Sequence, residues 1–155
     1  MSERSVTHNT FTIERAFDAP VARVFKAFAD WEAKKRWFAS PEGWIQGEAN
    51  MDFRVGGREV NRGGPKGGPV SFFDARYYDI VPNERIVYAY EMYLDDKRIS
   101  VSVSTFELKA DGGRTRLTLT EQGVYLDGFD NGAQREHGTR ELLDALGESL
   151  KAPQK

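Results

Sequence analysis

Apolar residues near the start of the chain recur first with a period of two and then with a helical period. Over residues 10–17, Phe11, Ile13 and Phe17 share one face, which predicts a half-buried strand. Asp18 can cap a helix that follows, and Pro20 suits the first turn of that helix, where its missing N–H costs nothing. Apolar positions at i, i+3, i+4 and i+7 then predict an amphipathic helix with one apolar stripe, formed by Val21, Val24, Phe25 and Phe28.

Asp30 can cap a second short helix, which carries Trp31, Ala33, Trp37 and Phe38 before the turn residues 40–43 end it. From Trp44 onward the period is two, and we expect strands at about residues 44–53, 57–62, 70–81, 84–93, 98–109 and 114–122. The glycine-rich segment 63–69 is expected to be a flexible hairpin loop. Consecutive strands joined by short turns predict an antiparallel meander.

The last predicted element is a long helix over residues 132–150. Asn131 can cap it, and Gln134 follows at the spacing of a capping box. Pro153 is expected to end the helix, and His137 is expected to point to solvent. Helical spacing gathers one set of residues on the opposite, inner side, namely Arg135, Gly138, Thr139, Leu142 and Leu146.

These elements predict an α+β protein with the order β-α-α-β(6)-α. The simplest packing is a helix-grip fold, in which a seven-stranded curved antiparallel sheet wraps around the long C-terminal helix. We expect a single domain over residues 1–155, with a core at about residues 8–150 and short disordered tails. A curved sheet and a straight helix do not match in shape, so a cavity is expected between them.

Composition excludes several classes of function. The 22 basic and 24 acidic residues give a net charge of −2, whereas a nucleic-acid-binding protein needs a basic excess. The absence of cysteine excludes disulfides and thiolate chemistry, and two histidines are too few for a histidine-rich site, so no metal and no cofactor are expected. No apolar run reaches membrane-spanning length, so we expect no membrane insertion and a cytoplasmic location.

Several segments, taken in their order along the chain, resemble a known family. They are the strand ending at Asp18-Ala19-Pro20, the helix-ending Trp37, the turn at residues 54–58, the hairpin at residues 80–88 and the strand motif at residues 113–119. Over about residues 8–150 the chain resembles homologues of the C-terminal domain of the ninety-kilodalton heat-shock-protein ATPase activator, in the START and polyketide-cyclase (SRPBCC) superfamily. This resemblance implies the β-α-α-β(6)-α fold with a central hydrophobic cavity. The superfamily includes lipid carriers, cyclases, hydrolases, hormone binders and chaperone-linked proteins.

One position departs from the family pattern. Members of the family often carry tryptophan after a glycine in the last helix, whereas here Gly138 is followed by Thr139. A small polar residue in place of a large ring should widen the cavity or admit water near Thr139.

Glu121 is the candidate catalytic residue. It alternates with Leu117 and Leu119, so it is expected to face inward, where desolvation raises a carboxyl pKa toward the range useful for a general acid. The alternative is that Glu121 lies in water at the end of the strand. Arg135 is placed at the cavity mouth, where it could pair with Glu121 or with an anionic ligand, or instead extend to solvent.

A wall of aromatic and aliphatic side chains is expected around the cavity. Tyr88, Tyr90 and Met92 alternate on one strand, and Val101 and Val103 alternate on the next; plain core packing is the alternative. The complete set of candidate pocket residues is Trp37, Trp44, Phe72, Tyr88, Tyr90, Met92, Val101, Val103, Leu119, Glu121, Phe129, Arg135, Thr139 and Leu142.

Three functions remain open at this point. The first is binding of a small hydrophobic molecule, lipid-like or aromatic, between the sheet and the C-terminal helix. The second is a cyclase- or hydrolase-type enzyme in which Glu121 is the acid or base. The third, which the family resemblance alone implies, is a chaperone-linked or stress-response interaction domain. A homodimer formed through the sheet edges is also compatible with the sequence.

Overall fold

The computed structural model describes residues 4–38 and 41–151. One antiparallel sheet of seven strands has the order β1-β7-β6-β5-β4-β3-β2. Its strands are β1 (Val6–Phe17), β2 (Trp44–Met51), β3 (Arg58–Pro65), β4 (Ser71–Val81), β5 (Arg85–Leu94), β6 (Lys97–Asp111) and β7 (Arg114–Leu126). The helices are α1 (Val21–Ala29), α2 (Trp31–Phe38) and α3 (Gly132–Lys151).

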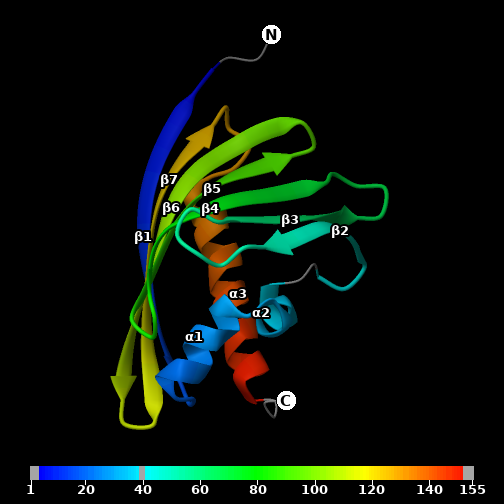
Figure 1. The fold of residues 1–155 in the computed structure, drawn as a ribbon. Coiled ribbons are helices and arrows are strands. Elements are labelled where there is room, and N and C mark those ends of the chain that lie inside the picture. Colours follow the sequence, from blue (N-terminus) through cyan, green and yellow to red (C-terminus); the bar gives the residue numbers. More distant parts are fainter. Residues whose placement is uncertain (1–3, 39–40, 152–155) are drawn as a thin grey trace.

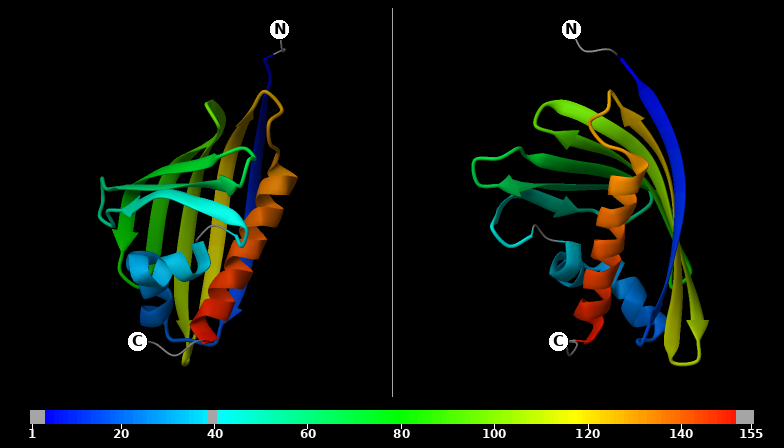
Figure 2. Two further views of the ribbon diagram at one scale, coloured as in Figure 1. Left: turned by 90° about the vertical axis from the view of Figure 1, so that its right-hand side faces the viewer. Right: turned by 180° about the vertical axis from the view of Figure 1, so that it is seen from behind.

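The sheet bends around α3, and the two short helices lie beside the C-terminal half of α3 (Figures 1 and 2). The curvature leaves one concave face, and α3 runs along it. The predicted α+β helix-grip fold is therefore confirmed, including the element order and the antiparallel meander that follows the helical pair.

The core forms where inward-facing rows of neighbouring strands meet the helices. Leu119 on β7 lies opposite Ile13 on β1 and Phe106 on β6, and all three side chains are buried. From the other side, Leu143 and Leu146 of α3 join the same hydrophobic cluster. The alternation that predicted each strand thus also selects the face that the helices cover.

The start of α1 differs from the prediction. The N-cap is Pro20, whose carbonyl accepts hydrogen bonds from the backbone N–H groups of Arg23 and Val24, and no side chain caps this end. The helix begins three residues after Asp18, so the Asp18 carboxylate is too distant in sequence to serve as its cap. The prediction of an Asp18 cap is therefore wrong.

The glycine-rich segment also differs from the prediction. Gly63, Gly64 and Pro65 belong to β3, so the loop before β4 is shorter than expected. A Cβ on Gly64 would lie 2.3 Å from the carbonyl oxygen of Pro69, so this glycine permits a close backbone approach. The predicted helix stop at Pro153 lies outside the described residues. Among the helices described, none is long and apolar enough to cross a membrane.

Candidate functional site

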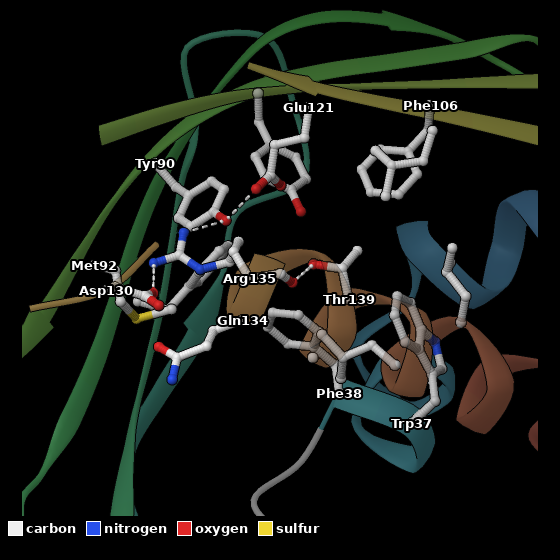
Figure 3. A pocket seen from close by; sticks show the side chains of 16 residues that line it. Trp37, Phe38, Tyr90, Met92, Phe106, Glu121, Asp130, Gln134, Arg135 and Thr139 are labelled. Atoms are coloured by element: carbon white, nitrogen blue, oxygen red, sulfur yellow. Dashed lines mark hydrogen bonds and ion pairs between the residues drawn. The ribbon is translucent and has the colours of Figure 1, made fainter. Parts of the chain in front are cut away.

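A cavity of about 270 Å³ lies between the concave face of the sheet, α2 and α3. Strands β4 to β7 supply one wall, α2 supplies a second, and the N-terminal half of α3 supplies the third (Figure 3). The lining residues are Trp37, Phe38, Phe73, Tyr88, Tyr90, Met92, Phe106, Leu119, Glu121, Asp130, Gln134, Arg135, Gly138, Thr139, Leu142 and Leu143.

The aromatic rings in the lining contact one another in a continuous series. The ring of Phe73 lies 5.1 Å from that of Phe38 and 5.0 Å from that of Tyr90, measured between centroids. Trp37 is held in place because its indole N–H donates a hydrogen bond of 2.9 Å to the carbonyl of Ala27 on α1. These contacts give the cavity a preformed apolar wall.

One end of the cavity is polar, and Glu121 is its centre. The Glu121 side chain is buried, with 3% of the residue exposed. Its Oε1 accepts a hydrogen bond of 2.8 Å from the Ser104 hydroxyl, and its Oε2 accepts one of 3.0 Å from the Tyr90 hydroxyl. Glu121 thus connects β7 through its carboxylate to the adjacent strand β6 and to β5, the strand beyond it.

Arg135 reaches the same polar end from α3. Its Nη1 donates a 2.8 Å hydrogen bond to the Tyr90 hydroxyl oxygen, and its Nη2 donates bonds of 2.7 Å to both Ser100 and Asp130. In Figure 3 the side chains of Arg135, Tyr90 and Glu121 point toward one another across the cavity end. We call the residues Ser100, Ser104, Tyr90, Glu121, Asp130 and Arg135 the polar network.

The start of α3 is fixed by local contacts that place Arg135 correctly. The Asn131 side chain accepts a 2.9 Å hydrogen bond from the backbone N–H of Gln134, so Asn131 caps the helix as its sequence position predicts. Gly132 packs against Asn9 of β1 so closely that a Cβ would lie 2.2 Å from the Asn9 amide nitrogen. A larger residue at this position would therefore force the Asn9 side chain to move where α3 meets the sheet.

Burial and neighbouring charges together set the pKa values of the polar network. Burial raises the pKa of Glu121 above its ordinary value, and the hydrogen bond from Ser104 and the charge of Arg135 only partly offset this effect. Burial and the negative charge of Glu121 likewise raise the pKa of Tyr90. Burial acts to lower the pKa of Arg135, but the neighbouring Tyr90, Asp130 and Glu121 outweigh it, so the pKa of Arg135 is raised and the guanidinium stays charged.

A second, smaller hollow of about 190 Å³ adjoins the cavity on the side of β2 and β3. The cavity and this outer hollow are both lined by the same four side chains, which separate them: Phe38, Phe73, Met92 and Leu142. Trp44, with Pro41 and Asn61, lines only the outer hollow. The main cavity therefore ends at this partition of four side chains.

The structure places most of the predicted pocket residues in the wall of the main cavity. They are Trp37, Tyr88, Tyr90, Met92, Leu119, Glu121, Arg135, Thr139 and Leu142. The sequence left open whether Glu121 faces inward or lies in water at the end of the strand. In the structure it faces inward and is buried. Arg135 is mostly buried as well, with 10% of its side chain exposed, so it does not extend to solvent. His137 is exposed, as its helical position predicts.

The predicted inward orientation of Val101 and Val103 is wrong. These residues are 38% and 40% exposed, and the side chains that face inward on β6 are Ser100, Ser102 and Ser104. The register explains this arrangement, because the inward residues Tyr88 and Tyr90 of β5 lie opposite Ser104 and Ser102. The apolar character of the valines suggested the wrong face.

Three further candidates lie outside the main cavity. Phe129 is 42% exposed in the turn before α3, where the Lys97 ammonium approaches its ring. Phe72 points away from the cavity and stacks with the guanidinium of Arg62 at 4.0 Å, because it is out of phase with the inward Phe73 on β4. Trp44 is 39% exposed and belongs to the outer hollow. None of these three lines the main cavity as predicted.

Sequence reasoning missed several lining residues: Phe38, Phe73, Phe106, Asp130, Gln134 and Leu143. It placed Gly138 on the inner side of the last helix but did not name it as a pocket residue. The signal for Asp130 was present, since an acid just before a helix cap can reach a base one turn into the helix. The signal for the inward serines was their alternation with Val101 and Val103. The aromatic residues Phe38 and Phe73 each adjoin a predicted pocket residue in sequence.

A separate buried cluster lies outside the cavity wall. Lys34 of α2 forms an ion pair of 2.6 Å with Glu59 of β3, and both side chains are almost fully buried. Tyr77 donates a hydrogen bond to the same oxygen of Glu59. This cluster ties α2 to the sheet, and no feature of the sequence pattern predicted it. Among the described residues, no group of histidines and carboxylates is arranged to hold a metal ion.

Solved structures similar to this one come from several bacteria. The Mll3558 protein of Rhizobium loti is 48% identical, with 94% of this chain and 99% of that chain covered and a TM-score of 0.88. A protein from Rhizobium leguminosarum is 45% identical over 97% of this chain and 99% of its own, with a TM-score of 0.91. CalU16 from Micromonospora echinospora is 20% identical and has a TM-score of 0.65, so it shares the fold. No curated protein matches the sequence significantly.

The sequence profile of one protein family matches nearly the whole of the described fold. The match extends over residues 18–152, from the turn before α1 to the end of α3. It includes both helices of the helical pair, strands β2 to β7 and every residue that lines the cavity. The chain therefore belongs to the family described as Activator of Hsp90 ATPase homolog 1-like protein.

Proposed function

We propose that this protein binds a small, largely apolar ligand in the cavity between the sheet and α3. The observation that carries the proposal is a preformed cavity whose wall is largely apolar, with aromatic and aliphatic side chains, and whose charged groups gather at one end. Apolar walls supply affinity by burying ligand surface, and a few polar groups fix the orientation of the ligand. The fold is one whose relatives commonly bind hydrophobic ligands.

The volume of the cavity indicates the size of the ligand. An engineered apolar cavity of about 150 Å³ binds benzene. The cavity here, at about 270 Å³, is a little under twice that size, which suits a molecule of two fused or linked rings. A long acyl chain would have to displace the partition at Phe38 and Leu142 to continue into the outer hollow.

A cavity-filling substitution tests this proposal. Thr139 lines the cavity, so Thr139→Trp places an indole in the space that the ligand would occupy. We expect two-ring aromatic probes such as naphthalene to bind the wild type, measured by native mass spectrometry or calorimetry, and to lose at least about tenfold in affinity in the variant. His137→Trp adds the same ring on the exposed side of α3 and should leave binding unchanged. Equal binding by Thr139→Trp and the wild type would contradict the proposal.

Acid–base catalysis is a second candidate function, and the environment of Glu121 favours it. A buried carboxyl whose pKa is raised, facing an apolar cavity and hydrogen-bonded to a tyrosine, has the properties of a general acid. If Glu121 is the general acid, we expect Glu121→Gln to abolish turnover of a substrate that binds in the cavity and to leave binding of that substrate intact. Unchanged turnover in that variant would rule out Glu121 as the acid.

An association with the Hsp90 chaperone is a third candidate, and its support is the description of the family. Its test is the ATPase rate of the purified chaperone with and without the full chain. A rate that does not change at saturating protein would contradict it.

A further inference from the structure

The polar end of the cavity determines which head group a ligand can carry there. Among the described lining residues, the charged side chains are Glu121, Asp130 and Arg135. Glu121 and Asp130 can accept hydrogen bonds, and Arg135 can only donate them. The chemistry of the ligand thus depends on which of these groups has capacity left after the contacts within the protein are made.

The described contacts of Arg135 use three of the five N–H groups of its guanidinium. Its Nη2 donates to Ser100 and to Asp130, which uses both hydrogens of that nitrogen, and its Nη1 donates to Tyr90. The Arg135 and Asp130 side chains are only 10% and 15% exposed. A ligand carboxylate could form a bidentate pair with Arg135 only by displacing Ser100 or Asp130 from Nη2, and loss of the Asp130 contact would leave a buried carboxylate without its partner.

The hydroxyl of Tyr90 is directed away from a ligand. Arg135 has no acceptor atom, so in their contact the Tyr90 oxygen accepts. The single Tyr90 proton is then donated to Glu121. The chain of donation therefore runs from Arg135 through Tyr90 to Glu121, and it ends on the carboxylate.

Glu121 has capacity left to accept hydrogen bonds. An ionised carboxylate has about four lone-pair positions, and the described contacts of Glu121 use two of them, from Ser104 and Tyr90. Because Glu121 also lines the cavity, the remaining positions can accept a hydrogen bond from a guest. The polar end thus offers an acceptor to the ligand.

The net charge of the polar network also disfavours an anionic ligand. With Glu121 ionised, two carboxylates and one guanidinium carry a net charge of −1. A ligand anion would add a second negative charge in a buried site, where charges interact more strongly than in water. A neutral ligand adds no such charge.

Resting on the proposed function, we infer that this cavity selects an uncharged aromatic ligand bearing a hydroxyl or N–H donor, which Glu121 accepts, and discriminates against carboxylates. Glu121 is the specificity-determining residue in this account, and Asp130 is a positioning residue that keeps Arg135 engaged. The raised pKa of Glu121 adds a second feature, since protonation of this group at low pH should weaken the discrimination.

The test compares three probes with the same ring system and different head groups. Calorimetric titration of the full chain at pH 7.5 would use naphthalene, 2-naphthol and 2-naphthoate. We expect 2-naphthol to bind about tenfold more tightly than naphthalene, and 2-naphthoate to bind at least about tenfold more weakly. Lowering the pH toward 5 should narrow the gap between 2-naphthol and 2-naphthoate.

Two variants locate the selectivity in the polar network. Glu121→Gln removes the negative charge at similar size, so 2-naphthoate should gain about tenfold relative to 2-naphthol. Asp130→Asn releases Arg135 without changing a fully buried side chain, and it should favour 2-naphthoate in the same direction. The matched control is Glu107→Gln, which removes an exposed carboxylate from β6 and should leave the ratio unchanged.

The outcomes separate this inference from the proposed function. If the wild type binds all three probes equally, or binds 2-naphthoate most tightly, the inference is overturned and ligand binding in the cavity stands. If none of the three probes binds, the proposed function and the inference both fail. If the ratio does not move in Glu121→Gln and Asp130→Asn, the polar network does not set the selectivity and the inference is overturned.

Discussion

At the scale of the residue, Glu121 links the chemistry of the cavity to the stability of the fold. Its carboxyl is almost completely buried, and its pKa in the folded protein is raised above the ordinary value of 4.5. Below pH 4.5 the carboxyl is protonated in both the folded and the unfolded chain, so no buried charge opposes folding. As the pH rises through the folded-state pKa, the charged form is buried and the folded state loses stability.

The first prediction concerns this pH dependence. From about pH 4.5 upward, the free energy of unfolding of the wild type should fall relative to that of Glu121→Gln, and the difference should level off above the folded-state pKa. Urea unfolding monitored by tryptophan fluorescence across a pH series measures this difference. Glu107→Gln, in which an exposed carboxylate changes, should show no comparable trend. A wild type that becomes more stable than Glu121→Gln with rising pH would contradict the assignment.

At the scale of the element, α2 depends on a buried ion pair for its position. Lys34 joins the helix to Glu59 of β3, and Trp37 and Phe38, one turn further along α2, form part of the cavity wall. The Lys34 ammonium also lies 4.5 Å from the centre of the Phe38 ring. The contact that fixes α2 on the sheet thus also fixes one side of the cavity.

Removing one charge of this pair should be costly. Lys34→Met leaves Glu59 buried without its counter-ion, and we expect a loss of about 3–5 kcal/mol in the free energy of unfolding, measured by chemical denaturation. Adding Glu59→Gln removes the second charge while keeping an acceptor for Tyr77, so the double variant should recover part of that loss. Lys35→Met, in an exposed pair with Glu32, should change stability by less than about 0.5 kcal/mol. A double variant less stable than Lys34→Met would contradict this view of the pair.

At the scale of the whole molecule, the mismatch between a curved sheet and a straight helix produces the cavity. The sheet bends around α3 (Figure 2). The space that remains is lined by α2, α3 and side chains of β4 to β7. A ligand in this space would contact several elements at once and bind the folded chain alone, so occupancy should stabilise the entire domain.

This coupling gives a thermal prediction. A two-ring probe present at about 100 times its dissociation constant should stabilise the fold by about 2.7 kcal/mol, which corresponds to a rise in Tm of about 5–10 °C for a domain of this size. Differential scanning calorimetry measures the shift. In Thr139→Trp the shift should disappear, and in His137→Trp it should persist. A probe that binds without raising the Tm would show that it does not occupy the folded interior.

The sequence predicted part of the cavity wall correctly and part of it wrongly. Tyr88, Tyr90 and Leu119 were placed in the wall because a period of two assigns alternate residues of a strand to one face. The same reasoning failed for Val101 and Val103, since the face of β6 follows from its register with β5, and short inward serines occupy the positions opposite bulky tyrosines. The period of two separates the two faces of a strand but does not say which face is buried. For β6, hydropathy predicted that the valine face is buried, whereas the serine face is.

The order of the elements, the antiparallel sheet and the long C-terminal helix with an inward face were all predictable from the sequence, because hydrophobic period and turn residues are local properties of the chain. The folded arrangement was needed to learn that Arg135 reaches Glu121 through Tyr90, and that Lys34 pairs with Glu59. These contacts join residues from different elements, or depend on how the start of α3 sits against the sheet. The partner of a buried charge is set by which elements pack together in space, and no local pattern encodes that choice.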